Sequence, residues 1–75
     1  MPRYFFHVQD AVELPDRYGL ELPDLAEARK TAIEAAGEML KDSARKLPAG
    51  SEWRLWVTDQ AGGTVCDLRF SMECP

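Results

Sequence analysis

The 75-residue sequence has little of what marks secreted or membrane-spanning proteins. It contains two cysteines, whereas a disulfide-stapled secreted domain of this size usually carries about four or more. No apolar run approaches the roughly 20 residues that span a bilayer, and no apolar signal-peptide region follows Arg3. We therefore expect a cytoplasmic protein with no membrane span and with reduced thiols at Cys66 and Cys74. A disulfide between these two cysteines stays open as the alternative.

Basic residues are also scarce. The chain has 9 Lys and Arg against 13 Asp and Glu, and its formal net charge is −4. One acidic stretch, opposed only by Arg17, accounts for this whole excess; it contains Asp10, Glu13, Asp16, Glu21 and Asp24. Because proteins that bind nucleic acids normally present a basic footprint, the composition argues against nucleic acid as a general partner.

The sequence has no motif that would support catalysis or cofactor binding. His7 is the only histidine, and no motif supplies it with a nucleophile and an orienting carboxylate. The spacing of His7, Cys66 and Cys74 lacks the close pairs of structural zinc sites. Neither a lysine nor a helical pattern follows Gly62-Gly63, as a phosphate-binding loop requires. We therefore predict a protein that is not an enzyme and holds no metal or cofactor, and we leave any small-molecule ligand open.

What the sequence does have is the composition of one folded domain, with 45% apolar and 29% charged residues. We predict a single domain over residues 1–75 with a loose tail at 71–75. Segments rich in aromatic and β-branched residues predict strands at 3–8, 18–22, 52–58 and 64–70. Residues 9–16 are polar and include Pro15, so we predict a loop there.

A single helix is predicted from Asp24 to about Lys46. Asp24 is a suitable N-cap, and Glu27, three residues later, completes a variant of the capping box. Apolar residues then recur at helical spacing and form one stripe: Leu25, Ala28, Ala32, Ala35, Ala36, Met39 and Leu40. Because this stripe is mostly alanine, the helix axis can lie close to a sheet.

The order of these elements predicts an α+β fold. We expect a two-layer ββαββ arrangement, in which one long helix packs on one face of an antiparallel sheet of three to four strands. Alternation along the strands assigns one set of side chains to the helix side: Tyr4, Phe6, Val8, Trp53, Leu55, Val57, Cys66, Leu68 and Phe70. The other set has a formal charge of +1 and forms the helix-free face: Arg3, Phe5, His7, Glu52, Arg54, Trp56, Val65, Asp67 and Arg69.

The helix-free face is the candidate site. Trp and Arg are enriched at binding hot spots because they bury large areas and keep a polar group. We interpret this face as a protein-binding or self-association surface, with the candidate contact residues Arg3, Phe5, His7, Arg54, Trp56 and Arg69. Two alternatives stay open. Either the face is solvated, with Trp56 packed on Phe5 and the arginines paired to Glu52 and Asp67, or Phe5 and Trp56 stack single-stranded nucleic acid.

The sequence also resembles an uncharacterised bacterial family of short proteins that carry a domain of unknown function. Three segments carry the resemblance: Met1-Pro2-Arg3-Tyr4-Phe5-Phe6-His7, Leu20-Glu21-Leu22-Pro23-Asp24 before an Ala/Glu/Arg-rich helix, and Val57-Thr58-Asp59 before a glycine turn. The resemblance covers nearly the whole chain. It implies no activity, so no functional residue is carried over from it.

A weaker similarity links residues 4–40 to the N-terminal domain of HicB-type antitoxins. In that domain, too, an aromatic first strand, a turn containing Pro-Asp and an amphipathic helix follow in order. The similarity implies a partial double-stranded-RNA-binding-like fold and a regulator linked to nucleic acid. We expect no separate DNA-binding domain in this chain, so only the partner-binding half of that role would apply.

Overall fold

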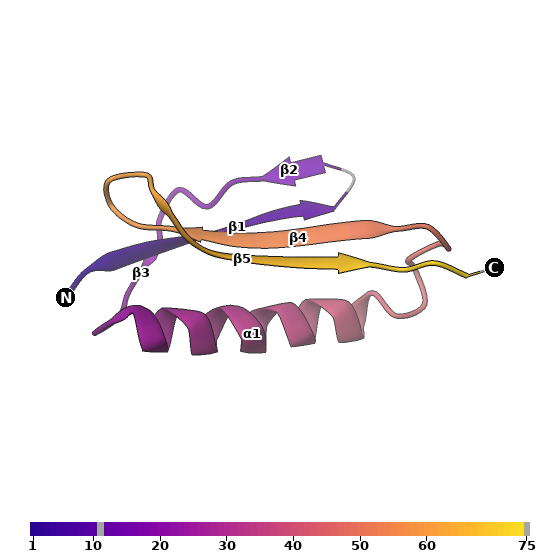
Figure 1. Ribbon diagram of the computed structural model, residues 1–75, viewed down its shortest axis with the longest axis horizontal. Coiled ribbons are helices and arrows are strands. Elements are labelled where there is room, and N and C mark those ends of the chain that lie inside the picture. The colour runs from indigo at the N-terminus through magenta and orange to yellow at the C-terminus, as the bar shows by residue number, and fades with distance from the viewer. Residues whose placement is uncertain (11, 75) are drawn as a thin grey trace.

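A sheet and one helix form two layers in the computed structural model, which describes residues 1–10 and 12–74 (Figure 1). In this part of the chain the sheet has five strands: four follow the order β2-β1-β4-β5, and β3 pairs with β1. The elements are β1 (Arg3–Asp10), β2 (Val12–Leu14), β3 (Leu20–Glu21), α1 (Leu25–Asp42), β4 (Glu52–Thr58) and β5 (Thr64–Ser71). All pairs are antiparallel, and α1 packs against β4 and β5. The predicted α+β architecture is therefore confirmed.

The core lies between the sheet and the helix. Trp53, Leu55 and Val57 of β4 are buried, and the residues paired with them on β1 and β5 pack against the same cluster, as the alternation predicted. Val65 is an exception, because it was predicted on the helix-free face and instead packs against the core. The register between β4 and β5 shifts at Val57/Thr58, and this irregularity breaks the alternation at the start of β5.

The helix begins where the sequence predicted and ends earlier. Asp24 is the N-cap, and its side chain accepts the backbone N–H of Glu27 at 2.9 Å. The alanine positions Ala28, Ala32 and Ala36 are the buried residues of α1. The helix ends at Asp42 rather than near Lys46: the apolar stripe stops at Leu40, and Ser43 forms the C-cap, with its N–H directed to the carbonyls of Lys41 and Met39.

Strand β1 pairs with two short strands at the same edge, where the sequence predicted one. β2 lies inside segment 9–16, so the prediction of an uninterrupted loop there was wrong. β3 confirms the strand predicted over 18–22, in a shorter form. β2 pairs with the end of β1 and β3 with its beginning. β2 could not be predicted from local propensity, because its formation depends on backbone hydrogen bonds with β1 rather than on its own three residues.

The C-terminal segment continues the pairing of β5. The backbone N–H of Met72 donates to the carbonyl of Ser51 at 3.0 Å, and the carbonyl of Met72 accepts from Gly50 at 2.9 Å. Of the tail predicted at 71–75, residue 75 lies outside the described residues. Cys66 is half-buried, Cys74 is exposed, and both are free. Among the described residues no helix is long and apolar enough to cross a membrane.

Candidate functional site

The helix-free face is organised around Trp56, at the middle of β4. Strand register places His7 of β1 on one side of Trp56 and Asp67 of β5 on the other. One pair further along, Arg54 lies between Gln9 and Arg69. Three adjacent strands therefore bring these side chains onto one surface, as the alternation predicted.

Two side chains, one aromatic and one cationic, pack against the Trp56 ring. The His7 imidazole lies 5.3 Å from it between ring centroids, tilted by 30°. The guanidinium carbon of Arg54 lies 4.3 Å from the Trp56 ring centroid, within the range of a cation–π interaction. Trp56 is half-buried, so the ring is held in place while part of it faces solvent. A side chain that is already ordered loses little entropy when a partner covers it.

Asp67 ties two arginines into one network. Arg54 donates two hydrogen bonds to the Asp67 carboxylate, at 2.9 and 2.8 Å, and Arg69 approaches it at 3.4 Å. These hydrogen bonds, chiefly those from Arg54, bring the pKa of Asp67 below its usual value, and the same contact raises the pKa of Arg54. The side chain of Arg69 is 76% exposed, so most of its donors remain available to a partner.

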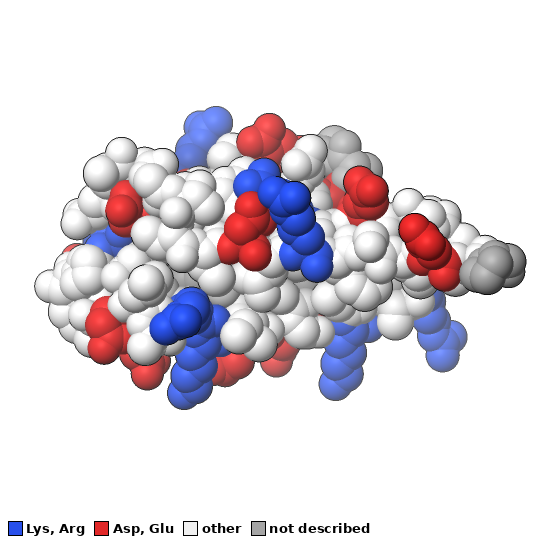
Figure 2. Space-filling model, in the orientation of Figure 1, with Lys and Arg blue, Asp and Glu red and all other residues white. Residues whose placement is uncertain are grey.

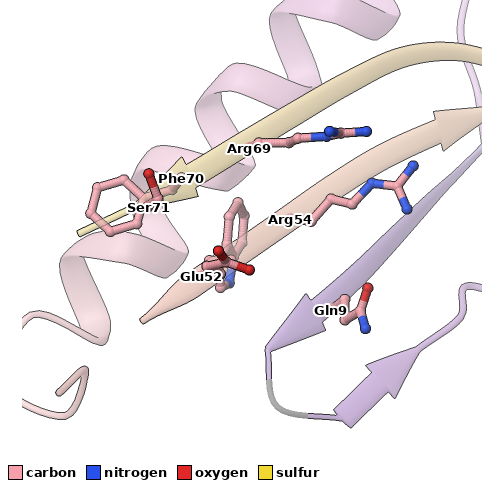
Figure 3. Close-up of a pocket in the computed structure, with 7 residues that line it drawn as sticks. Gln9, Glu52, Arg54, Arg69, Phe70 and Ser71 are labelled. Atoms are coloured by element: carbon pink, nitrogen blue, oxygen red, sulfur yellow. The ribbon is translucent and has the colours of Figure 1, made fainter. Parts of the chain in front are cut away.

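A shallow hollow of about 560 Å³ opens beside this network, where β4 begins and β5 ends (Figure 3). Its lining consists of Gln9, Glu52, Trp53, Arg54, Arg69, Phe70 and Ser71. In Figure 3 the side chains of Gln9, Arg54 and Arg69 project from three neighbouring strands toward the same side of the sheet. The hollow thus offers amide and guanidinium donors, with the Glu52 carboxylate at its rim.

Asp16 holds the connection between β2 and β3 against β1. Its carboxylate accepts the backbone N–H of Phe6 at 3.0 Å on one oxygen, and those of Tyr18 and Gly19 at 3.0 and 3.1 Å on the other. Its own N–H donates to Nδ1 of His7 at 3.1 Å. Asp16 therefore supplies a hydrogen-bond acceptor to β1 between the residues that pair with β2 and those that pair with β3.

The predicted contact residues of β1 have structural partners of their own. His7 contacts the Thr58 hydroxyl through Nε2 at 2.9 Å; because Nδ1 accepts from a backbone N–H, the neutral ring carries its proton on Nε2. Arg3 donates to the Tyr18 carbonyl at 2.7 Å and pairs with Glu21 at 3.2 Å. Phe5 lies under Gly19, where an added Cβ would come within 2.9 Å of its ring. These three residues hold the connection between β2 and β3, and β3 itself, against β1.

The charge of the face differs from the prediction of +1. Cross-strand pairing adds Glu13, opposite Gln9, and Glu21, opposite Arg3. The face then carries Arg3, Arg54 and Arg69 against Glu13, Glu21, Glu52 and Asp67, which is a formal charge of −1. Figure 2 shows acidic and basic groups interleaved in the view, without a large patch of one sign. The sequence missed this balance because it did not show which strands β1 would pair with.

Comparison with known proteins identifies a family. The family model for a domain of unknown function, DUF6894, matches residues 3–71. The chain belongs to this family. No curated protein and no solved structure matches the DUF6894 chain, and nothing supports the similarity to HicB-type antitoxins. Within the described residues of this DUF6894 domain, no group of three or more His, Cys, Asp or Glu side chains is placed to hold a metal ion.

The structure separates the six predicted contact residues of this DUF6894 domain into two groups. Arg54, Trp56 and Arg69 gather around Asp67, while His7 joins this group to the fastening residues of β1. Alternation assigned Asp67 to the face, but Asp67 was not among the predicted contact residues. Its position in sequence, with Arg69 two residues away and Arg54 on the neighbouring strand, could have indicated its role. The role of Asp16 had no signal in the sequence, because it depends on the gap between β2 and β3.

Proposed function

We propose that this DUF6894 domain is a non-enzymatic protein-binding module that contacts its partner through the helix-free face. The observation that carries the proposal is the arrangement of Trp56, which lies half-exposed at the middle of the sheet between His7 and Arg54. Hot spots are commonly central, aromatic and ordered before binding.

Electrostatics supports a protein partner over a nucleic acid. The face has mixed charges and a formal charge of −1, within a chain of net charge −4. A phosphate backbone would meet Arg69 as the most exposed donor but would also meet four carboxylates on the same surface. A protein surface with its own mixture of charges can be matched to such a face. Binding of single-stranded RNA or DNA at low salt would favour the antitoxin-like alternative instead.

The proposal is tested by replacing Trp56 with Glu. The immobilised domain and its Trp56→Glu variant are used to capture proteins from the source cells, and captured proteins are quantified by mass spectrometry. We expect the captured partner to bind the variant with a Kd at least about thirtyfold higher, since truncating a hot-spot aromatic costs about 2 kcal/mol or more.

A matched control is available on the opposite side of the sheet. Leu14 is 58% exposed and pairs with Val8 on the helix side, so Leu14→Glu makes the same kind of change away from the helix-free face. Leu14→Glu should leave the partner bound. Equal retention of the same proteins by wild type and Trp56→Glu would refute the proposed use of this face.

A further inference from the structure

The two edges of the sheet are built differently. The outer edge of β1 is occupied by β2 and β3, and the Asp16 carboxylate accepts from Phe6 between them. At the other edge, within the described part of the chain, β5 pairs only with β4. β5 is 8 residues long and contains no proline, although open edges are commonly shortened or interrupted to prevent pairing. This edge is therefore free to accept another strand.

The sequence of β5 is complementary to itself in one antiparallel register. We propose that β5 pairs with β5 of a second copy of this chain, about a two-fold axis at Leu68. In this register Asp67 faces Arg69 of the second copy, and Arg69 faces its Asp67, so two opposite-charge pairs form on the helix-free face. On the helix side Leu68 faces its counterpart, and Cys66 faces Phe70.

The backbone of β5 fits the same register. Both the N–H and the C=O of Met72 point toward β4, where they bond to Ser51 and Gly50. Because these directions alternate along a strand, the groups of Leu68 also point toward β4, and those of Asp67 and Arg69 point outward. Pairing about Leu68 therefore makes Asp67 and Arg69 of opposite copies a hydrogen-bonded backbone pair, so their outward N–H and C=O groups are satisfied in the same register that pairs their charges.

The helix position allows this pairing and adds to it. α1 packs over β4 and β5. With strands about 4.8 Å apart, the two-fold axis would place the two helices about 10 Å from each other, which is a normal distance for packed helices. Ile33 of α1 is 61% exposed, whereas Glu27 and Thr31 on the opposite flank are half-buried, where the sheet continues toward β1. The Ile33 flank therefore overlooks the open edge and would contact the second helix.

The test is the molar mass in solution, measured by light scattering across a concentration series. We expect the wild-type chain to reach twice its mass of 8.5 kDa. Arg69→Asp places two acidic residues against each other at both pairs, and Asp67→Arg does the same with two arginines. Each variant alone should dissociate at least about tenfold more readily than wild type. Both variants should keep the circular dichroism spectrum of the wild-type chain, which checks that they fold.

Mixing the two variants tests the register itself. In a mixed dimer the native Asp67 of the Arg69→Asp copy faces the native Arg69 of the Asp67→Arg copy. The two substituted side chains, one acidic and one basic, face each other at the second pair. A one-to-one mixture should therefore regain the dimer mass that each variant lacks. Ile33→Asp, which leaves β5 unchanged, should also weaken the dimer. A wild-type monomer at every concentration, or no recovery of dimer on mixing, would overturn the proposal.

This inference does not rest on the proposed function, and the two fail separately. Trp56 lies on β4, beside Asp67 but one strand inside the β5 edge, so it makes no contact across the proposed two-fold axis and Trp56→Glu should leave the dimer mass unchanged. Dissociation by Trp56→Glu, with a normal mass for Arg69→Asp, would assign self-association to the face and not to the edge. Loss of the captured partner with an intact dimer would support the face proposal alone.

Discussion

Replacing Asp16 with Ala tests how the segment between β2 and β3 is fastened to the sheet. The change removes the acceptor of three backbone N–H groups, of which those of Phe6 and Gly19 are partly buried. A hydrogen bond to a charged group contributes about 1.5–3 kcal/mol. The N–H of Tyr18 is exposed and can bond to water instead, and the other two donors are only partly buried. We therefore expect the free energy of unfolding to fall by about 2 kcal/mol.

The loss can be measured by thermal and urea unfolding, followed through tryptophan fluorescence. For a domain of this size, about 2 kcal/mol corresponds to a decrease of roughly 8–16 °C in Tm. Asp16→Asn keeps one acceptor oxygen and places an amide N–H₂ where the second oxygen was. The free energy of unfolding of Asp16→Asn should therefore lie between those of wild type and Asp16→Ala, about 1 kcal/mol below wild type.

The dependence on pH gives an independent check. Partial burial raises the pKa of Asp16, but the N–H groups of Phe6, Gly19 and Tyr18 outweigh it and bring the pKa below its usual value. The contribution of the charged carboxylate is therefore fully present above the unfolded pKa of about 3.9 and is lost as pH falls through the folded pKa. The stability difference between wild type and Asp16→Ala should shrink as the solution is acidified from neutral pH. A difference that stays constant from neutral to strongly acidic pH would refute this reasoning.

Two glycines and the helix cap provide further predictions. Gly19→Ala should lower the free energy of unfolding by about 2 kcal/mol or more, because φ is +71° and the new Cβ would lie 2.9 Å from Arg3, Phe5 and the Tyr4 carbonyl. Gly37→Ala should instead raise it by about 1 kcal/mol, because nothing lies within 4 Å of the new Cβ in α1. Opposite signs in urea unfolding check this pair, and equal signs would contradict it. Asp24→Ala should cost about 1 kcal/mol, with a loss of helical circular dichroism in the first turn; an unchanged midpoint would argue against the cap.

The elements with strong local patterns were predictable. Alternation of Trp53, Leu55 and Val57 with Arg54 and Trp56 assigned both faces of β4, because the side-chain period of a strand leaves few choices once one face is buried. The cap at Asp24 was equally local. In both cases the residues that decide the structure are close neighbours in sequence.

The elements that depend on distant partners were not predictable. β2 exists because Val8, Gln9 and Asp10 offer pairing groups to it, and the face acquires Glu13 and Glu21 only through this pairing and that of β3. The bulge that carries Val65 into the core likewise needs the register between two strands.

Local sequence patterns were enough to predict the fold class, the helix-covered face and the residues that β1 and β4 place on the opposite face. The pairing of Trp56 with His7 rather than Phe5, the link from Arg54 to Arg69 through Asp67, and the unpaired edge of β5 in the described part of the chain all follow from tertiary contacts. The reason is that alternation and helical periodicity are properties of adjacent residues. Strand order and register are set by contacts between residues far apart in the chain, which no local pattern specifies.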